Sequence, residues 1–182
     1  MRTRLAIVAA IFLVLGCLGR REAGAKTSMA PKAPSRGMTI TSPAFRENGS
    51  IPAKYGCGGS NISPPLGFSG APQNAKTLAL IVEDPDAPGG LFTHWVVWNI
   101  PASTATVAEG QPPAGGMEGE NSYGKSGYGT LCPPSGEHRY IFNVYALDAE
   151  LNLPASTGRE QLEAAMKGHV VAQTQLMGRY RK

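Results

Sequence analysis

The sequence predicts a mainly β, loop-rich fold, and two features support this expectation. Glycine and proline are abundant, with 23 and 15 among the 182 residues, and both interrupt helices. The apolar residues fall into several runs of strand length, and only one segment near the C-terminus repeats with the period of a helix. A chain of this length fits one domain with a substantial hydrophobic core.

Residues 1–17 are typical of a signal peptide. Arg2 and Arg4 precede an unbroken apolar run, Leu5 to Leu15, which is too short for a permanent membrane-spanning helix. The run ends in VLGC at positions 14–17, which resembles the bacterial lipoprotein box, where cleavage precedes a cysteine that carries lipid. The sequence therefore predicts a lipid anchor on Cys17 and a place in the bacterial cell envelope. Plain secretion with later cleavage, to the periplasm or beyond, is the alternative.

Residues 18–37 are predicted to be a flexible tether, because they contain small residues, prolines and cations and almost no large apolar side chain. The net charge of +4 is unevenly spread: residues 1–36 carry +6, and residues 37–182 carry −2. A slightly acidic body lacks the clustered cations that bind phosphate backbones. The sequence therefore predicts no nucleic-acid partner.

The predicted domain, residues 38–182, opens with a short strand in Met38–Phe45. Thr77–Glu83 and Phe92–Ile100 are nearly continuous apolar runs, as expected for strands buried on both faces. His138–Asp148 alternates between two faces and is the strongest strand pattern. A capping box of Thr157 and Glu160 announces a helix that ends at Gly168, and Val170–Met177 forms a final strand before a basic tail.

Residues 102–136 form the longest predicted loop. Within it, residues 119–126 (GENSYGKS) match the P-loop pattern letter for letter. No strand pattern precedes this match, and Gly127 and Gly129 would break a helix after it, so nucleotide binding is not expected. Loops of this length inside a compact domain are usually functional.

Two separated segments each combine a proline-stiffened loop with a histidine at the start of a strand. The first contains DPDAP at positions 84–88 and then His94, and the second contains Pro133 and Pro134 and then His138. If the two strands are neighbours, both histidines face one pocket with Asp84 at its floor. The simpler interpretation is a pair of turns with solvated aspartates and core histidines.

This combination resembles the phosphatidylethanolamine-binding protein family, in its bacterial Raf-kinase-inhibitor-like branch. The resemblance covers about residues 38–180 and includes NISPPL at positions 61–66 and YALD at positions 145–148. It implies a β-sandwich with a large central antiparallel sheet, a smaller sheet and a few peripheral helices. It also implies a small cavity for phosphate-like anions or phospholipid headgroups, lined by Asp84, Asp86, His94, Pro133, Pro134, His138 and Tyr140.

An acidic residue beside two histidines favours their charged forms, so we expect raised pKa values and at least one imidazolium at neutral pH. The imidazolium, hydroxyls and backbone N–H groups would then hold the anion. We predict no cofactor, no resident metal and no catalytic residue. The alternatives are a metal-dependent phosphoester hydrolase built on the same Asp/His cluster, and a module that inhibits or regulates a protein partner.

Beyond Cys17, the remaining cysteines are Cys57 and Cys132, both in predicted loops. An even pair in an exported protein favours a disulfide, which would close a loop of about 75 residues. Two buried free thiols are the alternative. Related bacterial proteins are often homodimers, but no sequence feature marks one here.

Overall fold

The structure is a computed structural model that describes residues 37–182. The predicted signal peptide, the predicted lipid anchor on Cys17 and all but the last residue of the predicted tether lie outside the described residues. Within the described range, no helix has both the length and the apolar character needed to cross a membrane.

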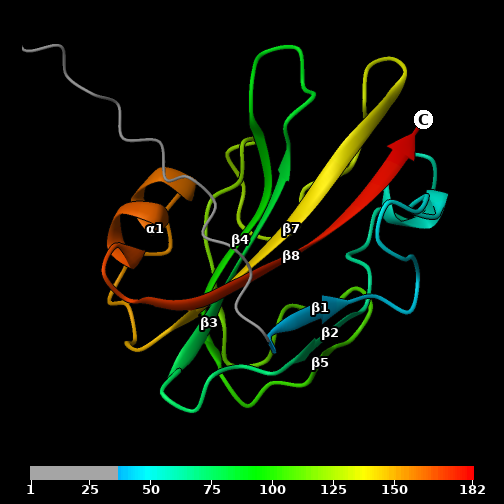
Figure 1. Cartoon of the computed structure of the whole chain (residues 1–182). Helices are drawn as coiled ribbons and strands as arrows, with labels where there is room; N and C mark the ends of the chain where they lie inside the picture. The colour runs from blue at the N-terminus through cyan, green and yellow to red at the C-terminus, as the bar shows by residue number, and fades with distance from the viewer. Residues whose placement is uncertain (1–36) are drawn as a thin grey trace, which may run out of the picture. The chain divides into compact units, whose positions relative to one another are not determined.

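Two antiparallel β-sheets and one α-helix make up the fold (Figure 1). The five-stranded sheet has the order β6-β4-β3-β7-β8 and the three-stranded sheet the order β1-β2-β5, which confirms the mainly β prediction. The five-stranded sheet contains β3 (Thr77–Asp84), β4 (Phe92–Pro101), β6 (Met117–Glu118), β7 (Glu137–Leu147) and β8 (Val170–Arg181). The smaller sheet contains β1 (Thr39–Thr41), β2 (Leu66–Ser69) and β5 (Thr106–Val107), and the helical elements are the short 3₁₀-helix η1 (Ala53–Tyr55) and α1 (Arg159–Met166).

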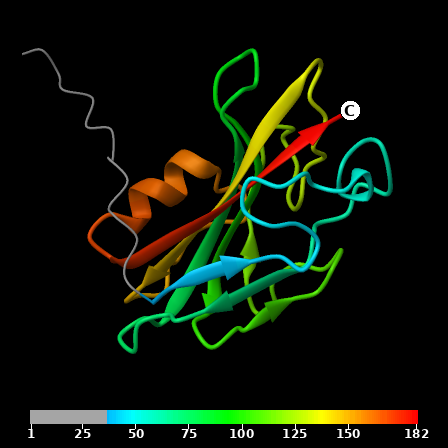
Figure 2. The same cartoon turned by 45° about the vertical axis from the view of Figure 1, so that its right-hand side comes forward.

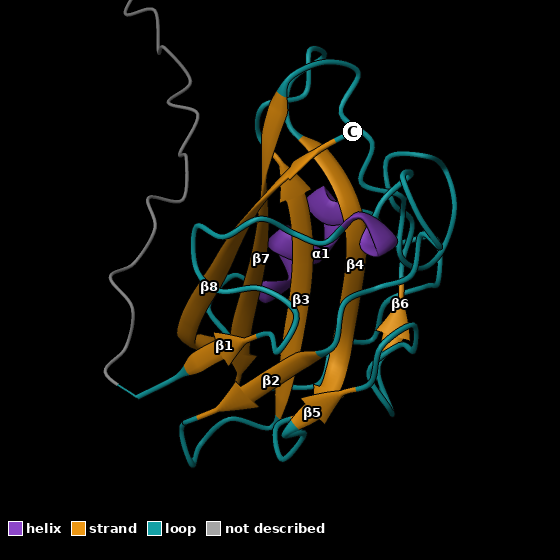
Figure 3. Cartoon of the chain, turned by 90° about the vertical axis from the view of Figure 1, so that its right-hand side faces the viewer, coloured by secondary structure: helices purple, strands orange, loops and turns teal. Residues whose placement is uncertain are grey.

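The five-stranded sheet is covered on both faces. On one face, Leu80 belongs to a buried cluster that includes Phe68 of the smaller sheet. On the other face, Ile81 packs in a cluster with Leu162 and Met166 of helix α1. Figure 3 shows the smaller sheet in front of β3 and β4 with α1 behind them, and Figure 2 shows the same arrangement from another side. Because β3 is central and covered on both faces, its run from residue 78 to residue 82 is apolar throughout.

The ends of two elements differ from the prediction. Strand β8 continues to Arg181, and Tyr180 is buried in it opposite His138. The predicted basic tail is the end of this strand, in which the arginines alternate with buried residues. Helix α1 begins at Arg159, and its capping contact is a hydrogen bond from the Gly158 N–H to Gln161 Oε1 at 3.2 Å. The Thr157 hydroxyl instead donates to the carbonyl oxygen of Pro154 at 2.6 Å, so the predicted capping box of Thr157 and Glu160 is wrong.

The predicted disulfide between Cys57 and Cys132 is present, with a Cα–Cα distance of 5.3 Å. The Cys57 N–H also donates to the carbonyl oxygen of Leu131 at 3.0 Å. The loop that follows η1 is therefore tied twice to the segment that leads into Pro133 and β7. This arrangement holds two loops that are distant in the sequence against the same end of the five-stranded sheet.

Candidate functional site

A β-bulge places His94 on the face of the sheet that carries the other candidate residues. Val82 of β3 pairs with Trp95 and Glu83 pairs with Thr93, so His94 is an extra residue in β4. In a regular strand His94 and Trp95 would point to opposite faces. Here the His94 ring instead packs edge-on to the Tyr140 ring of β7, with 5.3 Å between centroids, in the layer that also contains Trp95.

Asp84 and His138 form the polar centre of the site. Asp84 is the last residue of β3, and His138 is the second residue of the neighbouring strand β7. The two side chains are joined at 2.7 Å between Asp84 Oδ2 and His138 Nδ1, and the residues are only 4% and 7% exposed. Because a carboxylate accepts, His138 Nδ1 carries the hydrogen. The second carboxylate oxygen accepts the Asp86 N–H at 2.8 Å, which fixes the carboxylate plane.

The surroundings and the pKa of His94 differ from those that the sequence predicts. Its Nδ1 lies 3.3 Å from the carbonyl oxygen of Gly129, and its Nε2 is buried without a hydrogen-bond partner among the described residues. Burial lowers the pKa of His94 to about 4, although Asp84 and the nearby carbonyl groups of Gly129 and Thr130 act in the opposite direction. The prediction of a raised pKa is therefore wrong for His94, because desolvation outweighs the attraction of the carboxylate.

Tyr140 contributes a second buried polar atom. Its ring lies between His94 and Tyr180, with 6.4 Å between the Tyr140 and Tyr180 centroids. Burial, followed by the charge of Asp84, raises the pKa of the Tyr140 hydroxyl above its ordinary value, so the hydroxyl keeps its proton. Asp84 contributes to this shift as a hydrogen-bond acceptor as well as through its charge, but the buried hydroxyl makes no full hydrogen bond among the described residues.

The other predicted site residues lie around this centre. Asp86 is exposed and accepts two hydrogen bonds from the Arg139 guanidinium, at 2.9 and 2.7 Å, and one from its N–H at 2.9 Å. These bonds lower the pKa of Asp86 to about 2. Pro133 is buried and Pro134 is exposed. The structure thus brings together Asp84, His94, His138 and Tyr140, while the Asp86 carboxylate is engaged by Arg139.

Aromatic side chains that the sequence analysis missed cover His94. The Phe92 ring lies 5.0 Å and the Tyr123 ring 6.0 Å from the His94 ring. Tyr123 is 43% exposed, and its hydroxyl donates to the carbonyl oxygen of Thr130 at 2.9 Å. Its position in the long glycine-rich loop was the only sequence signal for this role. Tyr123 therefore packs against the His94 ring, and His94 is only 3% exposed.

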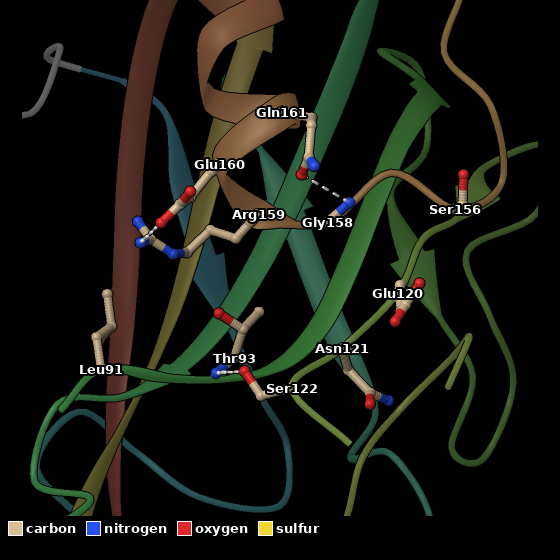
Figure 4. A pocket seen from close by; sticks show the side chains of 10 residues that line it. All are labelled: Leu91, Thr93, Glu120, Asn121, Ser122, Ser156, Gly158, Arg159, Glu160 and Gln161. Carbon is tan, nitrogen blue, oxygen red and sulfur yellow. Dashed lines mark hydrogen bonds and ion pairs between the residues drawn. The ribbon is translucent and has the colours of Figure 1, made fainter. Parts of the chain in front are cut away.

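A cavity of about 330 Å³ lies near the N-terminus of α1 (Figure 4). Its only cationic lining residue, Arg159, lies 3.6 Å from Glu83, 3.7 Å from Glu160 and 2.8 Å from Glu163. These carboxylates offset the charge of the guanidinium, so the cavity offers an anion little net positive charge. The lining residues are Leu91, Thr93, Glu120, Asn121, Ser122, Ser156, Gly158, Arg159, Glu160 and Gln161.

Two alternative chemistries gain no support from the described residues. Between residues 37 and 182, no group of three or more His, Cys, Asp and Glu side chains is arranged to hold a metal ion. No helix begins at Lys125 and Ser126, where a P-loop would require one, and that segment consists of turns and a single β-bridge.

Comparison with known proteins places this geometry in a family. The model of the phosphatidylethanolamine-binding protein family matches residues 41–181. A UPF0098 protein of Methanothermobacter thermautotrophicus is 46% identical over 150 residues, which span 80% of this chain and 99% of that protein.

Two solved structures are similar to this one. One is a phosphatidylethanolamine-binding protein homologue from Chlamydia trachomatis, with a TM-score of 0.78 and 46% identity, over 81% of this chain and 99% of that one. The other is E. coli YbcL, described as a member of the mammalian family, with a TM-score of 0.75 and 28% identity over 80% and 99% of the two chains. The chain therefore belongs to the phosphatidylethanolamine-binding protein family.

Proposed function

We propose that this chain binds a phosphate-like anion, free or as part of a phosphoryl headgroup, at the site formed by Asp84, His94, His138 and Tyr140. The observation that carries the proposal is that His94 Nε2 and Tyr140 Oη, two of five buried side-chain atoms without a hydrogen-bond partner among the described residues, belong to rings 5.3 Å apart. Buried polar atoms nearly always have a hydrogen-bond partner, and leaving one unsatisfied costs about 1–3 kcal/mol. A bound ligand that supplies both partners removes this cost.

The chemistry of the centre suits a phosphoryl group. The Tyr140 hydroxyl donates to an anionic oxygen, and the imidazole of His138 is a further hydrogen-bonding group of the same centre. Asp84 orients the His138 ring through the 2.7 Å contact. The name of the family and of the Chlamydia homologue refers to phosphatidylethanolamine, a phosphodiester, which supports the phosphoryl class in general but does not separate monoesters from diesters.

Inorganic phosphate is expected to bind the wild-type protein, and Tyr140→Phe is expected to weaken binding about tenfold because a donor to the anion is lost. Isothermal titration calorimetry measures both affinities. Tyr145→Phe is the matched control, since Tyr145 lies on the same strand and packs against the helix-side cluster. Undetectable phosphate binding by the wild type, or equal losses in the two variants, would contradict the proposal.

The lipoprotein-box motif supports a further proposal, that the protein is exported and anchored in the bacterial cell envelope through lipid on Cys17. Each buried CH₂ of such an anchor contributes about 0.8 kcal/mol to membrane binding. Cys17→Ser is therefore expected to move the protein from the membrane fraction to the soluble fraction, as followed by immunoblotting of fractionated cells. Unchanged membrane retention of the variant would argue against lipidation.

A further inference from the structure

We propose that the site selects phosphoryl ligands with a P–OH group, namely inorganic phosphate and phosphomonoesters. Phosphodiesters such as intact phospholipid headgroups, which have no P–OH, bind more weakly. The inference rests on the proposed function, because it concerns the same site. It depends on which nitrogen of the His94 ring carries the hydrogen.

The backbone of Gly129 determines the tautomer of His94. His94 Nδ1 lies 3.3 Å from the carbonyl oxygen of Gly129, and a carbonyl oxygen only accepts hydrogen bonds. Nδ1 therefore carries the hydrogen, and Nε2 of the neutral ring presents a lone pair. The Gly129 N–H also donates to the carbonyl oxygen of His94 at 2.7 Å, so the two residues are joined in both directions. A backbone contact of this kind is not easily rearranged when a ligand enters.

The surroundings of His94 keep its ring neutral. Phe92, Tyr140 and Tyr123 lie with ring centroids 5.0, 5.3 and 6.0 Å from that of His94, and the residue is only 3% exposed. Asp84 favours the charged form, but burial dominates and holds the pKa of His94 well below neutrality. At neutral pH the buried Nε2 is therefore an acceptor that needs a hydrogen.

His94 Nε2 and the Tyr140 hydroxyl, two of the buried atoms that lack a partner within residues 37–182, differ in what they require of a ligand. The Tyr140 hydroxyl offers a hydrogen, whereas His94 Nε2 requires one. Inorganic phosphate or a phosphomonoester monoanion supplies both an anionic oxygen for Tyr140 and a P–OH for His94. A phosphodiester has no P–OH. Its oxygen and His94 Nε2 would both be hydrogen-bond acceptors with no hydrogen between them, unless His94 took up a proton from water. Sites built around a hydrogen-bonding partner reject analogues that lack it.

Methyl phosphate and dimethyl phosphate form a matched pair of probes. At about pH 5 both carry a single negative charge, because the second ionisation of a phosphomonoester lies near pH 6. Calorimetry at this pH is expected to show methyl phosphate binding about tenfold tighter or more. At about pH 8 methyl phosphate has lost its P–OH, and its binding is expected to take up about one proton, measured in two buffers that differ in ionisation enthalpy.

A variant tests the role of His94 directly. The amide of Gln can turn an N–H toward the ligand, so His94→Gln is expected to reduce the preference for the monoester to within about threefold. His169→Gln is the control, because His169 is exposed and pairs with Asp148 at 2.9 Å. If His94→Gln does not fold, the comparison of the two esters on the wild-type protein still decides the question.

The outcomes separate this inference from the proposed function. The other titratable groups around His94 are Asp84, His138, Tyr140 and Tyr123, and their ionisation affects two monoanions alike, so the ratio of the affinities reports on the P–OH. Equal binding of the two esters by the wild type would overturn the inference and leave the anion site standing. Failure of both esters and of inorganic phosphate to bind would overturn the proposed function as well.

Discussion

Replacing Cys57 and Cys132 together by serine is expected to lower the free energy of unfolding by about 4 kcal/mol. The bridge joins residues 75 positions apart, and a crosslink over such a loop removes much of the conformational entropy of the unfolded chain. Urea unfolding of the oxidised wild type and of the double variant, followed by tryptophan fluorescence, measures the difference.

The reduced wild-type protein is the control for the serine substitutions, since it lacks the crosslink but keeps both side chains. Its urea unfolding midpoint is expected to lie close to that of the double variant. The loop carrying Cys57 also supports the site, because the Gly58 N–H donates to the Tyr180 hydroxyl at 3.0 Å and the Tyr180 ring packs against Tyr140. Unfolding midpoints that coincide for oxidised and reduced protein would show that the two loops are held by their other contacts alone.

The sequence predicted those strands that have a recognisable hydrophobic pattern within their own residues. The alternation in β7 and the continuous apolar run of β3 are both found in the structure, because one strand has faces of different character and the other is buried on both. The shortest strands, β5 and β6, have two residues each inside the predicted long loop. A two-residue segment has no periodicity to detect, so only its partners in the sheet define it.

The position of the His94 side chain could not be predicted from the sequence. The sequence places Asp84, His94 and His138 next to buried strands, but nothing in residues 92–95 reveals that the ladder with β3 gains a residue at His94. That bulge arises from pairing between strands, and it decides which face the imidazole occupies. The direction of the pKa shift of His94 likewise depends on burial, which a list of nearby charges does not contain.

Asp84→Asn is expected to destabilise the protein by about 3 kcal/mol and to abolish detectable phosphate binding. The substitution keeps the side-chain shape and an oxygen for the Asp86 N–H, but it removes the charge that faces His138 at 2.7 Å. Both residues are nearly fully buried, so the variant leaves the His138 Nδ1–H without its carboxylate acceptor at a place where little water can take over that role. Urea unfolding and phosphate calorimetry on the same sample measure the two effects.

A surface pair in the same chain provides the control. Asp148 binds His169 Nδ1 at 2.9 Å, but these side chains are 44% and 46% exposed, so Asp148→Asn is expected to cost less than about 1 kcal/mol. Both pairs join a histidine Nδ1 to an aspartate oxygen at a similar distance, so the difference in destabilisation between the two variants measures the effect of burial. If Asp84→Asn costs no more than Asp148→Asn, the buried Asp84–His138 pair contributes no more to stability than the exposed one, and the expected effect of burial is wrong.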